Sequence, residues 1–195
     1  MGSVAGIVLA GGRSTRFGSD KLREPYRGRP LLHHAIEAVT GVADDVVVVM
    51  GPAADGRDLP PGARLAHDPA EDEGPLAGLH AGLLAAVRSD VAVVVAGDMP
   101  EVPAAVLRLL IGSVDDGPAT ASALGTPSGP SPVPIGLRTW PAADAVHTLL
   151  HAGRRRLGDV LDVMRTEVIE EDRWTALDPG RRALFDVDER SDLER

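Results

Sequence analysis

Three short runs of this chain consist almost entirely of aliphatic residues. None of the three contains a charged side chain, and they cover residues 4–10, 46–50 and 91–96. A strand that is apolar on both faces has to be covered on both faces, as the strands of parallel sheets are. Segments with helical spacing of apolar residues separate these runs, at residues 31–39, 78–87 and 103–111. This alternation predicts an α/β fold in which a mostly parallel sheet lies between two layers of helices.

The rest of the chain continues the pattern less regularly. Apolar spacing predicts short strands at residues 63–67 and 167–169, and helices at residues 142–151 and 155–164. Residues 112–134 are rich in Gly, Pro, Ser and Thr, and we expect the part from 125 to 134 to be a mobile loop. A chain of 195 residues is long enough for one well-buried domain, so we expect residues 1–195 to form a single Rossmann-like, three-layer domain.

The composition excludes several classes of function. The net charge of −9 disfavours general binding to nucleic acid or to anionic membranes, and the 3% aromatic content disfavours stacking on nucleobases. Without cysteine the chain has no disulfide, thiolate nucleophile or zinc–thiolate site. No apolar stretch reaches membrane-spanning length, and no signal-peptide pattern is present. We therefore expect a cytoplasmic protein with neither a nucleic-acid nor a membrane partner.

The first apolar run ends in a double glycine, Gly11-Gly12, and a basic segment follows it. Residues 13–29 contain six basic and two acidic side chains, so this segment is positively charged although the whole chain is negatively charged. Glycines let a backbone approach a ligand closely, while N–H groups and cations bind phosphate oxygens. The segment therefore predicts a phosphate-binding loop. Neither the Walker A pattern nor the dinucleotide pattern G-x-G-x-x-G is present.

The pattern that is present resembles a known signature. Leu9-Ala10-Gly11-Gly12, then Arg16-Phe17-Gly18 and Lys21, is similar to the motif of nucleotidyltransferases that join a nucleoside triphosphate to a phosphorylated acceptor. The segments 74–78 (GPLAG) and 97–100 (GDMP) resemble those of the molybdenum cofactor guanylyltransferases. The resemblance is looser after residue 103: residues 131–135 depart from the family pattern, and Glu189-Arg190 stands where the family often has Thr-Pro. It implies a nucleotide-diphospho-sugar-transferase-like fold.

The resemblance also implies a reaction. The terminal phosphate of molybdopterin would attack the α-phosphorus of GTP, and pyrophosphate would leave. Gly11 and Gly12 would bind phosphates through backbone N–H groups, and Arg16 and Lys21 would neutralise the triphosphate. Asp98 would ligate Mg²⁺, with Asp188 as a second ligand and Asp186 as a weaker candidate. An alternative interpretation makes Asp98 a cap of the next helix.

The family's base-binding residues fall on the first loop and on two later segments. The backbone of Leu9, Ala10 and Gly11, the carboxylate of Asp68, and the segment from Gly74 to Gly78 would bind the guanine. Asp72 is close enough in sequence to be an alternative to Asp68. The Gly74-Pro75 pair also has the pattern of a helix start.

Other features leave alternatives open. Residues 154–156 (RRR) would face the acceptor in the family, but they also fit a solvated helix start. His147 and His151 have the spacing of a metal pair on one helix face, with no third ligand evident. The expected partners are GTP, molybdopterin, and molybdoenzymes or cofactor-delivery proteins. The rival functions are a cytidylyltransferase, a transferase for another phosphorylated acceptor, and a silent nucleotide-binding or cofactor-binding module.

Overall fold

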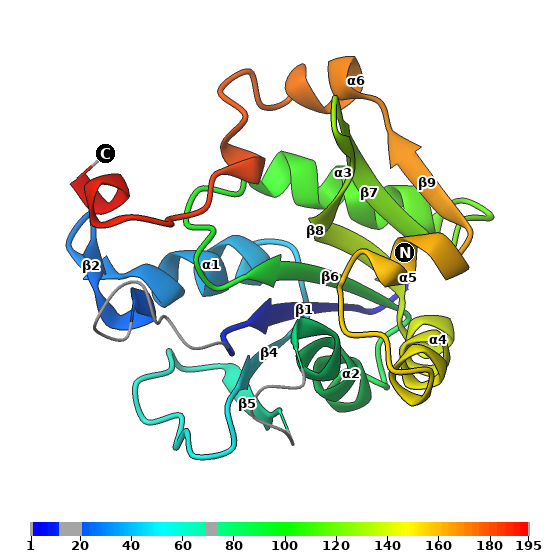
Figure 1. Ribbon diagram of the computed structural model, residues 1–195. Coiled ribbons are helices and arrows are strands. Elements are labelled where there is room, and N and C mark those ends of the chain that lie inside the picture. The colour runs from blue at the N-terminus through cyan, green and yellow to red at the C-terminus, as the bar shows by residue number, and fades with distance from the viewer. Residues whose placement is uncertain (1, 12–20, 69–73, 195) are drawn as a thin grey trace.

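The computed structural model describes residues 2–11, 21–68 and 74–194, and it contains a seven-stranded sheet (Figure 1). The strands follow the order β5-β4-β1-β6-β8-β7-β9. The four strands from β5 to β6 are mutually parallel, β8 is antiparallel to both of its neighbours, and β9 is parallel to β7. Their bounds are β1 (Val4–Leu9), β4 (Asp45–Met50), β5 (Ala63–His67), β6 (Val91–Ala96), β7 (Ala121–Thr126), β8 (Gly129–Arg138) and β9 (Thr166–Ile169). The predicted mostly parallel α/β sheet is confirmed.

Helices cover both faces of this sheet. Figure 1 shows α1 and α3 on one side of it and α2 and α4 on the other. The helices are α1 (Leu31–Thr40), α2 (Pro75–Ala85), α3 (Ala104–Asp115), α4 (Thr139–His151), α5 (Asp159–Val163) and α6 (Glu171–Thr175). Shorter elements are η1 (Lys21–Arg23), β2 (Pro25–Tyr26), β3 (Arg29–Pro30), η2 (Arg182–Leu184) and η3 (Arg190–Glu194). No helix in the described part of the chain is long and apolar enough to cross a membrane.

The central strands show why their sequences are uniformly apolar. In β4, Val46 and Val48 pack with α1 and its neighbours, whereas Val47 and Val49 pack against the α2 side. All four valines are buried. Successive side chains of a strand point to opposite faces, so a strand between two helical layers needs apolar residues at every position.

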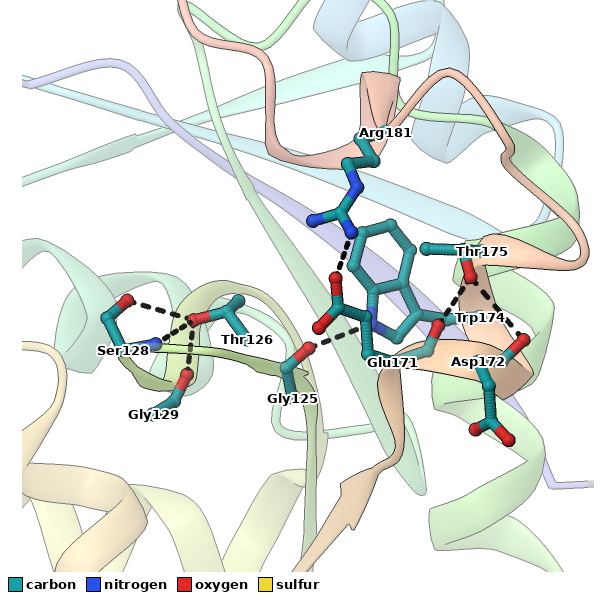
Figure 2. Close-up of polar contacts among 9 residues, drawn as sticks. All are labelled: Gly125, Thr126, Ser128, Gly129, Glu171, Asp172, Trp174, Thr175 and Arg181. Carbon is teal, nitrogen blue, oxygen red and sulfur yellow. Dashed lines mark hydrogen bonds and ion pairs between the residues drawn. The ribbon is translucent and has the colours of Figure 1, made fainter.

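The predicted mobile loop at residues 125–134 is wrong, because these residues form the ends and the turn of the β7–β8 hairpin. The Thr126 hydroxyl donates to the Gly129 carbonyl and accepts a hydrogen bond from the Ser128 N–H, which closes the turn (Figure 2). The buried Trp174 of α6 donates its ring N–H to the Gly125 carbonyl at 2.9 Å. Strand pairing and this tryptophan together hold the segment in place.

The helix predicted at residues 155–164 is shorter in the structure, where α5 covers Asp159–Val163. Residues 154–156 precede it, and Arg154 pairs with Asp159 at the start of the helix. Acidic residues are favoured at a helix start, and Asp159 occupies that position here. The arginines therefore belong to the connection from α4 rather than to a helix.

The chain returns to the carboxyl edge of the parallel strands after α6. In residues 178–188, which we call the return segment, the buried carboxylate of Asp178 accepts the Ala183 N–H at 2.8 Å. Further along, the Val187 N–H donates to the backbone carbonyl of Asp98 at 3.0 Å. Figure 1 shows the chain then ending beside β2. The return segment therefore brings Asp186 and Asp188 to the end of β6.

Candidate active site

Several predicted site residues that the structure describes lie at the carboxyl edge of β1, β4, β5 and β6. Three backbone hydrogen bonds hold the strand ends together: Ala10 N–H to Val49 O at 2.8 Å, Gly97 N–H to Leu9 O at 2.9 Å, and Asp68 N–H to Met50 O at 2.8 Å. The strand order reverses between β1 and β6, and ligands of open α/β sheets bind at such a point. The edge therefore gathers Leu9, Ala10, Gly11, Asp68 and Asp98 in one region.

The centre of this edge is an ion pair between Lys21 and Asp98. The Lys21 ammonium lies 2.8 Å from Oδ2 of Asp98, donates to the Val187 carbonyl at 2.6 Å, and is 3.9 Å from Oδ1 of Asp188. The Lys21 side chain is 12% exposed and that of Asp98 is 26% exposed. Three distant parts of the sequence therefore meet around one amino group.

Asp98 does not cap the following helix. Helix α3 begins at Ala104, its N-cap residue is Pro103, and no side chain caps it. The carboxylate of Asp98 instead points to Lys21. The structure therefore contradicts the alternative interpretation of Asp98 as a capping residue.

The groups around Lys21 suit a hard divalent cation. Asp98 and Asp188 offer carboxylate oxygens, and the Val187 carbonyl accepts a hydrogen bond from the same amino group of Lys21. Burial raises the pKa of Asp186, and the nearby Asp188 and Asp98 raise that pKa further. Among the described residues, no group of three or more His, Cys, Asp or Glu side chains is arranged to hold a metal ion. One or two carboxylates, with phosphates and waters completing the shell, is the usual environment of Mg²⁺.

A second polar network contacts the loop after β6, which contains Asp98. Glu101, whose side chain is 13% exposed, accepts a hydrogen bond from the Tyr26 hydroxyl and pairs with Arg27. The Arg182 Nε lies 3.6 Å from its other oxygen. Burial, followed by the hydrogen bond to Glu101, raises the pKa of Tyr26 to about 12. Glu101 thus links the loop after β6 to β2 and to the return segment.

The Asp68 carboxylate lies across β1 and β4 from this centre, beside two of the predicted glycines. A β-carbon placed on Gly78 would lie 3.3 Å from Oδ2 of Asp68, and one on Gly11 would lie 4.0 Å from the same atom. Gly78 also lies against Val49 of β4. The Asp68 carboxylate therefore packs closely against Gly78, where a larger residue would crowd it, and a carboxylate is a group that accepts hydrogen bonds.

The segment from Gly74 begins α2, as its Gly-Pro pair indicates. Gly74 has φ +85°, a conformation that favours glycine, and Pro75 is the first helical residue. The Arg155 carbonyl accepts the Leu76 N–H at 3.3 Å, so the 154–156 connection lies against the start of this helix. The side chain of Arg154 pairs with Asp159, whereas that of Arg155 donates to backbone carbonyls. These contacts place the basic connection beside the predicted nucleotide-binding segment.

The remaining predicted residues are placed differently. Gly12, Arg16 and Asp72 lie outside the described residues. The His147 and His151 rings are 4.4 Å apart, and His80 of α2 lies 5.6 Å from His147. Burial and the charge of His147 lower the pKa of His80. The third histidine was not predicted, and the three do not form a metal-binding arrangement.

Sequence reasoning missed Tyr26, Glu101, Arg182 and the Val187 carbonyl. No local pattern connects these residues, because they meet only through the fold. One signal was available for Lys21: it is the single lysine of the chain, beside 19 arginines. Arginine supplies every other permanent side-chain cation, and lysine differs from it in carrying a compact charge on a flexible stem.

Together, this fold and this edge define a class of enzyme, the nucleotidyltransferases. Residues 6–168 match the model of the MobA-like NTP transferase domain. The chain belongs to this family, which confirms the resemblance of its motifs.

Relatives and solved structures agree with this assignment. The chain is 31% identical over 196 residues to the molybdenum cofactor guanylyltransferase of Desulfosudis oleivorans, covering 100% of this chain and 95% of the relative. It is 31% identical over 198 residues to the probable molybdenum cofactor guanylyltransferase of Chloroflexus aggregans, covering 98% and 92%. The fold matches molybdopterin-guanine dinucleotide biosynthesis protein A from Archaeoglobus fulgidus with a TM-score of 0.82, 23% identity, and coverage of 98% and 95%.

Proposed function

We propose that this enzyme transfers GMP from GTP to the terminal phosphate of molybdopterin and releases pyrophosphate, with Mg²⁺ as its cofactor. The observation that carries the proposal is the position of the Lys21–Asp98 pair and of the Asp68 carboxylate at one edge of the sheet. The Lys21–Asp98 pair suits a triphosphate with its metal, and the Asp68 carboxylate suits a base. The names of the relatives support the choice of GTP and of molybdopterin.

The reaction asks these residues mainly for alignment and for neutralisation of charge. A phosphate oxygen of the acceptor forms a bond to the α-phosphorus, and the bond from that phosphorus to the bridging oxygen breaks. The leaving pyrophosphate keeps the electron pair of the broken bond. The nucleophile is already ionised, so no residue has to act as a general base. Mg²⁺ bound by Asp98 and Asp188 would supply charge neutralisation at the phosphates.

In this proposal the other residues bind and orient the nucleotide. Lys21 and Arg16 neutralise the triphosphate, and the backbone N–H groups of Gly11 and Gly12 bind its oxygens. The two oxygens of Asp68 accept hydrogen bonds from N1–H and N2–H of guanine. Cytosine offers a carboxylate only its exocyclic amine, which supports guanine over cytosine.

The test is a nucleotide comparison with purified protein. The protein is incubated with Mg²⁺, molybdopterin and, separately, GTP, CTP or ATP, and pyrophosphate is measured. We expect pyrophosphate with GTP and little with the other two, and loss of the signal when the divalent ion is chelated. Pyrophosphate from CTP but not from GTP would instead support a cytidylyltransferase. No product with any of the three would favour a silent binding module or another acceptor.

A further inference from the structure

The Lys21 ammonium lies beside the carboxylate oxygens with which Asp98 and Asp188 would bind a metal ion. It touches Oδ2 of Asp98 at 2.8 Å and the Val187 carbonyl at 2.6 Å, and Oδ1 of Asp188 lies 3.9 Å away. These three oxygens come from two segments that are far apart in the sequence. One cation therefore already neutralises the carboxylates and holds the return segment against the Asp98 loop.

A divalent ion on the same oxygen could not share this position with the ammonium. Mg²⁺ lies about 2.1 Å from its oxygen ligands. An ion on Oδ2 of Asp98 would thus lie within about 5 Å of the Lys21 nitrogen, given the 2.8 Å contact. At that distance the charges repel strongly in a partly buried site, where screening by water is reduced. Metal binding to this oxygen is therefore favoured when Lys21 moves away.

We propose that Lys21 is an exchangeable counter-ion of Asp98 and Asp188, and that the triphosphate makes metal binding favourable by accepting the displaced ammonium. This inference rests on the proposed function, since it takes Mg²⁺ and a nucleoside triphosphate as the ligands. The consequence is an order of binding: free metal ions bind poorly, and the metal enters together with the nucleotide. Lys21 passes from the carboxylates to the phosphates as the metal replaces it.

The small ligand set of the site supports the same order. The described residues include no arrangement of three or more acidic or histidine side chains suited to a metal ion. Two carboxylates alone hold Mg²⁺ weakly, and substrate phosphates usually complete its shell. The site therefore favours a metal–nucleotide complex over a free metal ion. Without that complex, Lys21 stays paired with Asp98.

Binding of Mn²⁺ without nucleotide tests the exchange, with unbound Mn²⁺ measured by electron paramagnetic resonance. The Lys21→Gln variant keeps a donor for the Val187 carbonyl but removes the charge, and Lys21→Met removes both. We expect Lys21→Gln to bind Mn²⁺ about tenfold more tightly than the unmodified protein, because the competing charge is gone. Arg23→Gln is the matched control: it removes a nearby cation that pairs with Asp58 and not with Asp98. Equal or weaker binding by Lys21→Gln would overturn the proposal.

A second measurement uses the unmodified protein and does not depend on a variant that folds. Since the chain has a single lysine, acetylation of its side chain, read by mass spectrometry, reports on Lys21 alone. We expect saturating Mn²⁺ to raise the acetylation rate severalfold and added GTP to lower it again. An unchanged rate while Mn²⁺ is bound would refute the exchange. If the protein shows these effects yet releases no pyrophosphate from GTP and molybdopterin, the proposed function fails and the exchange stands.

Discussion

Asp98 makes few contacts that the fold depends on, although it lies at the centre of the proposed site. Its carboxylate is partly exposed and binds Lys21, and its backbone carbonyl, which a substitution keeps, binds Val187. We expect Asp98→Asn to lower turnover about a hundredfold or more, because the proposed ligand of Mg²⁺ is lost. The free energy of unfolding should change by only about 1 kcal/mol, as for a partly exposed ion pair.

Asp58→Asn provides the comparison for that variant. Asp58 pairs with Arg23 at 3.0 Å on the surface, so its substitution also removes one carboxylate from an ion pair. Turnover, measured as pyrophosphate release, should be unchanged in this control. Proportionate losses of turnover and stability in Asp98→Asn would show that its role is structural.

In the proposed function, the choice of base depends on Asp68. An asparagine in its place offers one acceptor where the carboxylate offers two, so a guanine would lose a charge-assisted hydrogen bond. We expect Asp68→Asn to lower kcat/KM for GTP by about 10-fold to 100-fold, with a smaller effect on kcat. Asp72→Asn, measured in the same way, should have little effect. The reverse result would assign the base-binding role to Asp72.

The sequence contains enough information to predict some of these residues and not others. Asp68 and Asp98 follow predicted strands, and Lys21 belongs to the motif after the double glycine, so local patterns mark all three. Glu101 has no such mark, because its partners Tyr26, Arg27 and Arg182 reach it only after the β2–β3 hairpin and the return segment have folded.

At the scale of elements, one side-chain hydrogen bond joins α6 to the β7–β8 hairpin. Trp174→Phe keeps most of the apolar volume but removes the N–H that binds the Gly125 carbonyl (Figure 2). We expect the free energy of unfolding to fall by about 1–2 kcal/mol, because a partly buried carbonyl loses its partner. Denaturant unfolding measures the change. Trp140→Phe is the matched control, since Trp140 is 67% exposed, and a loss as large as that of Trp174→Phe would argue against this role.

The hairpin also shows where sequence patterns mislead. Residues 125–134 contain glycines and prolines, which usually mark loops. In the structure, β6 pairs only with residues 135–138 of β8, so the three prolines lie where β8 extends beyond that neighbour. A proline there costs no hydrogen bond to β6, and the strand tolerates it. The buried valine runs of β4 and β6 have no such ambiguity, and their strands were predicted correctly.

At the scale of the whole molecule, the histidines between α2 and α4 make stability depend on pH. Burial and the charge of His147 lower the pKa of His80, so the folded protein binds fewer protons than the unfolded chain below the ordinary pKa of about 6.5. This contribution to stability is complete above that pH and is lost as the pH falls through the lowered pKa. Urea unfolding at several pH values should show a smaller decline for His80→Gln than for the unmodified protein. His33→Gln, which lies outside this cluster, should follow the unmodified protein, and identical profiles for all three would contradict the assignment.

The return segment has a consequence for how the protein is made. Three residues that meet at the carboxyl edge leave the ribosome far apart in time, first Lys21, then Asp98 and then Val187. The parallel strands β1, β4, β5 and β6 can pair while the later part of the chain is still being synthesised. The Val187 carbonyl, which binds Lys21 next to Asp98, is synthesised only with the return segment. A growing chain therefore completes this edge of the sheet only after the return segment has been synthesised, well after the parallel strands have formed.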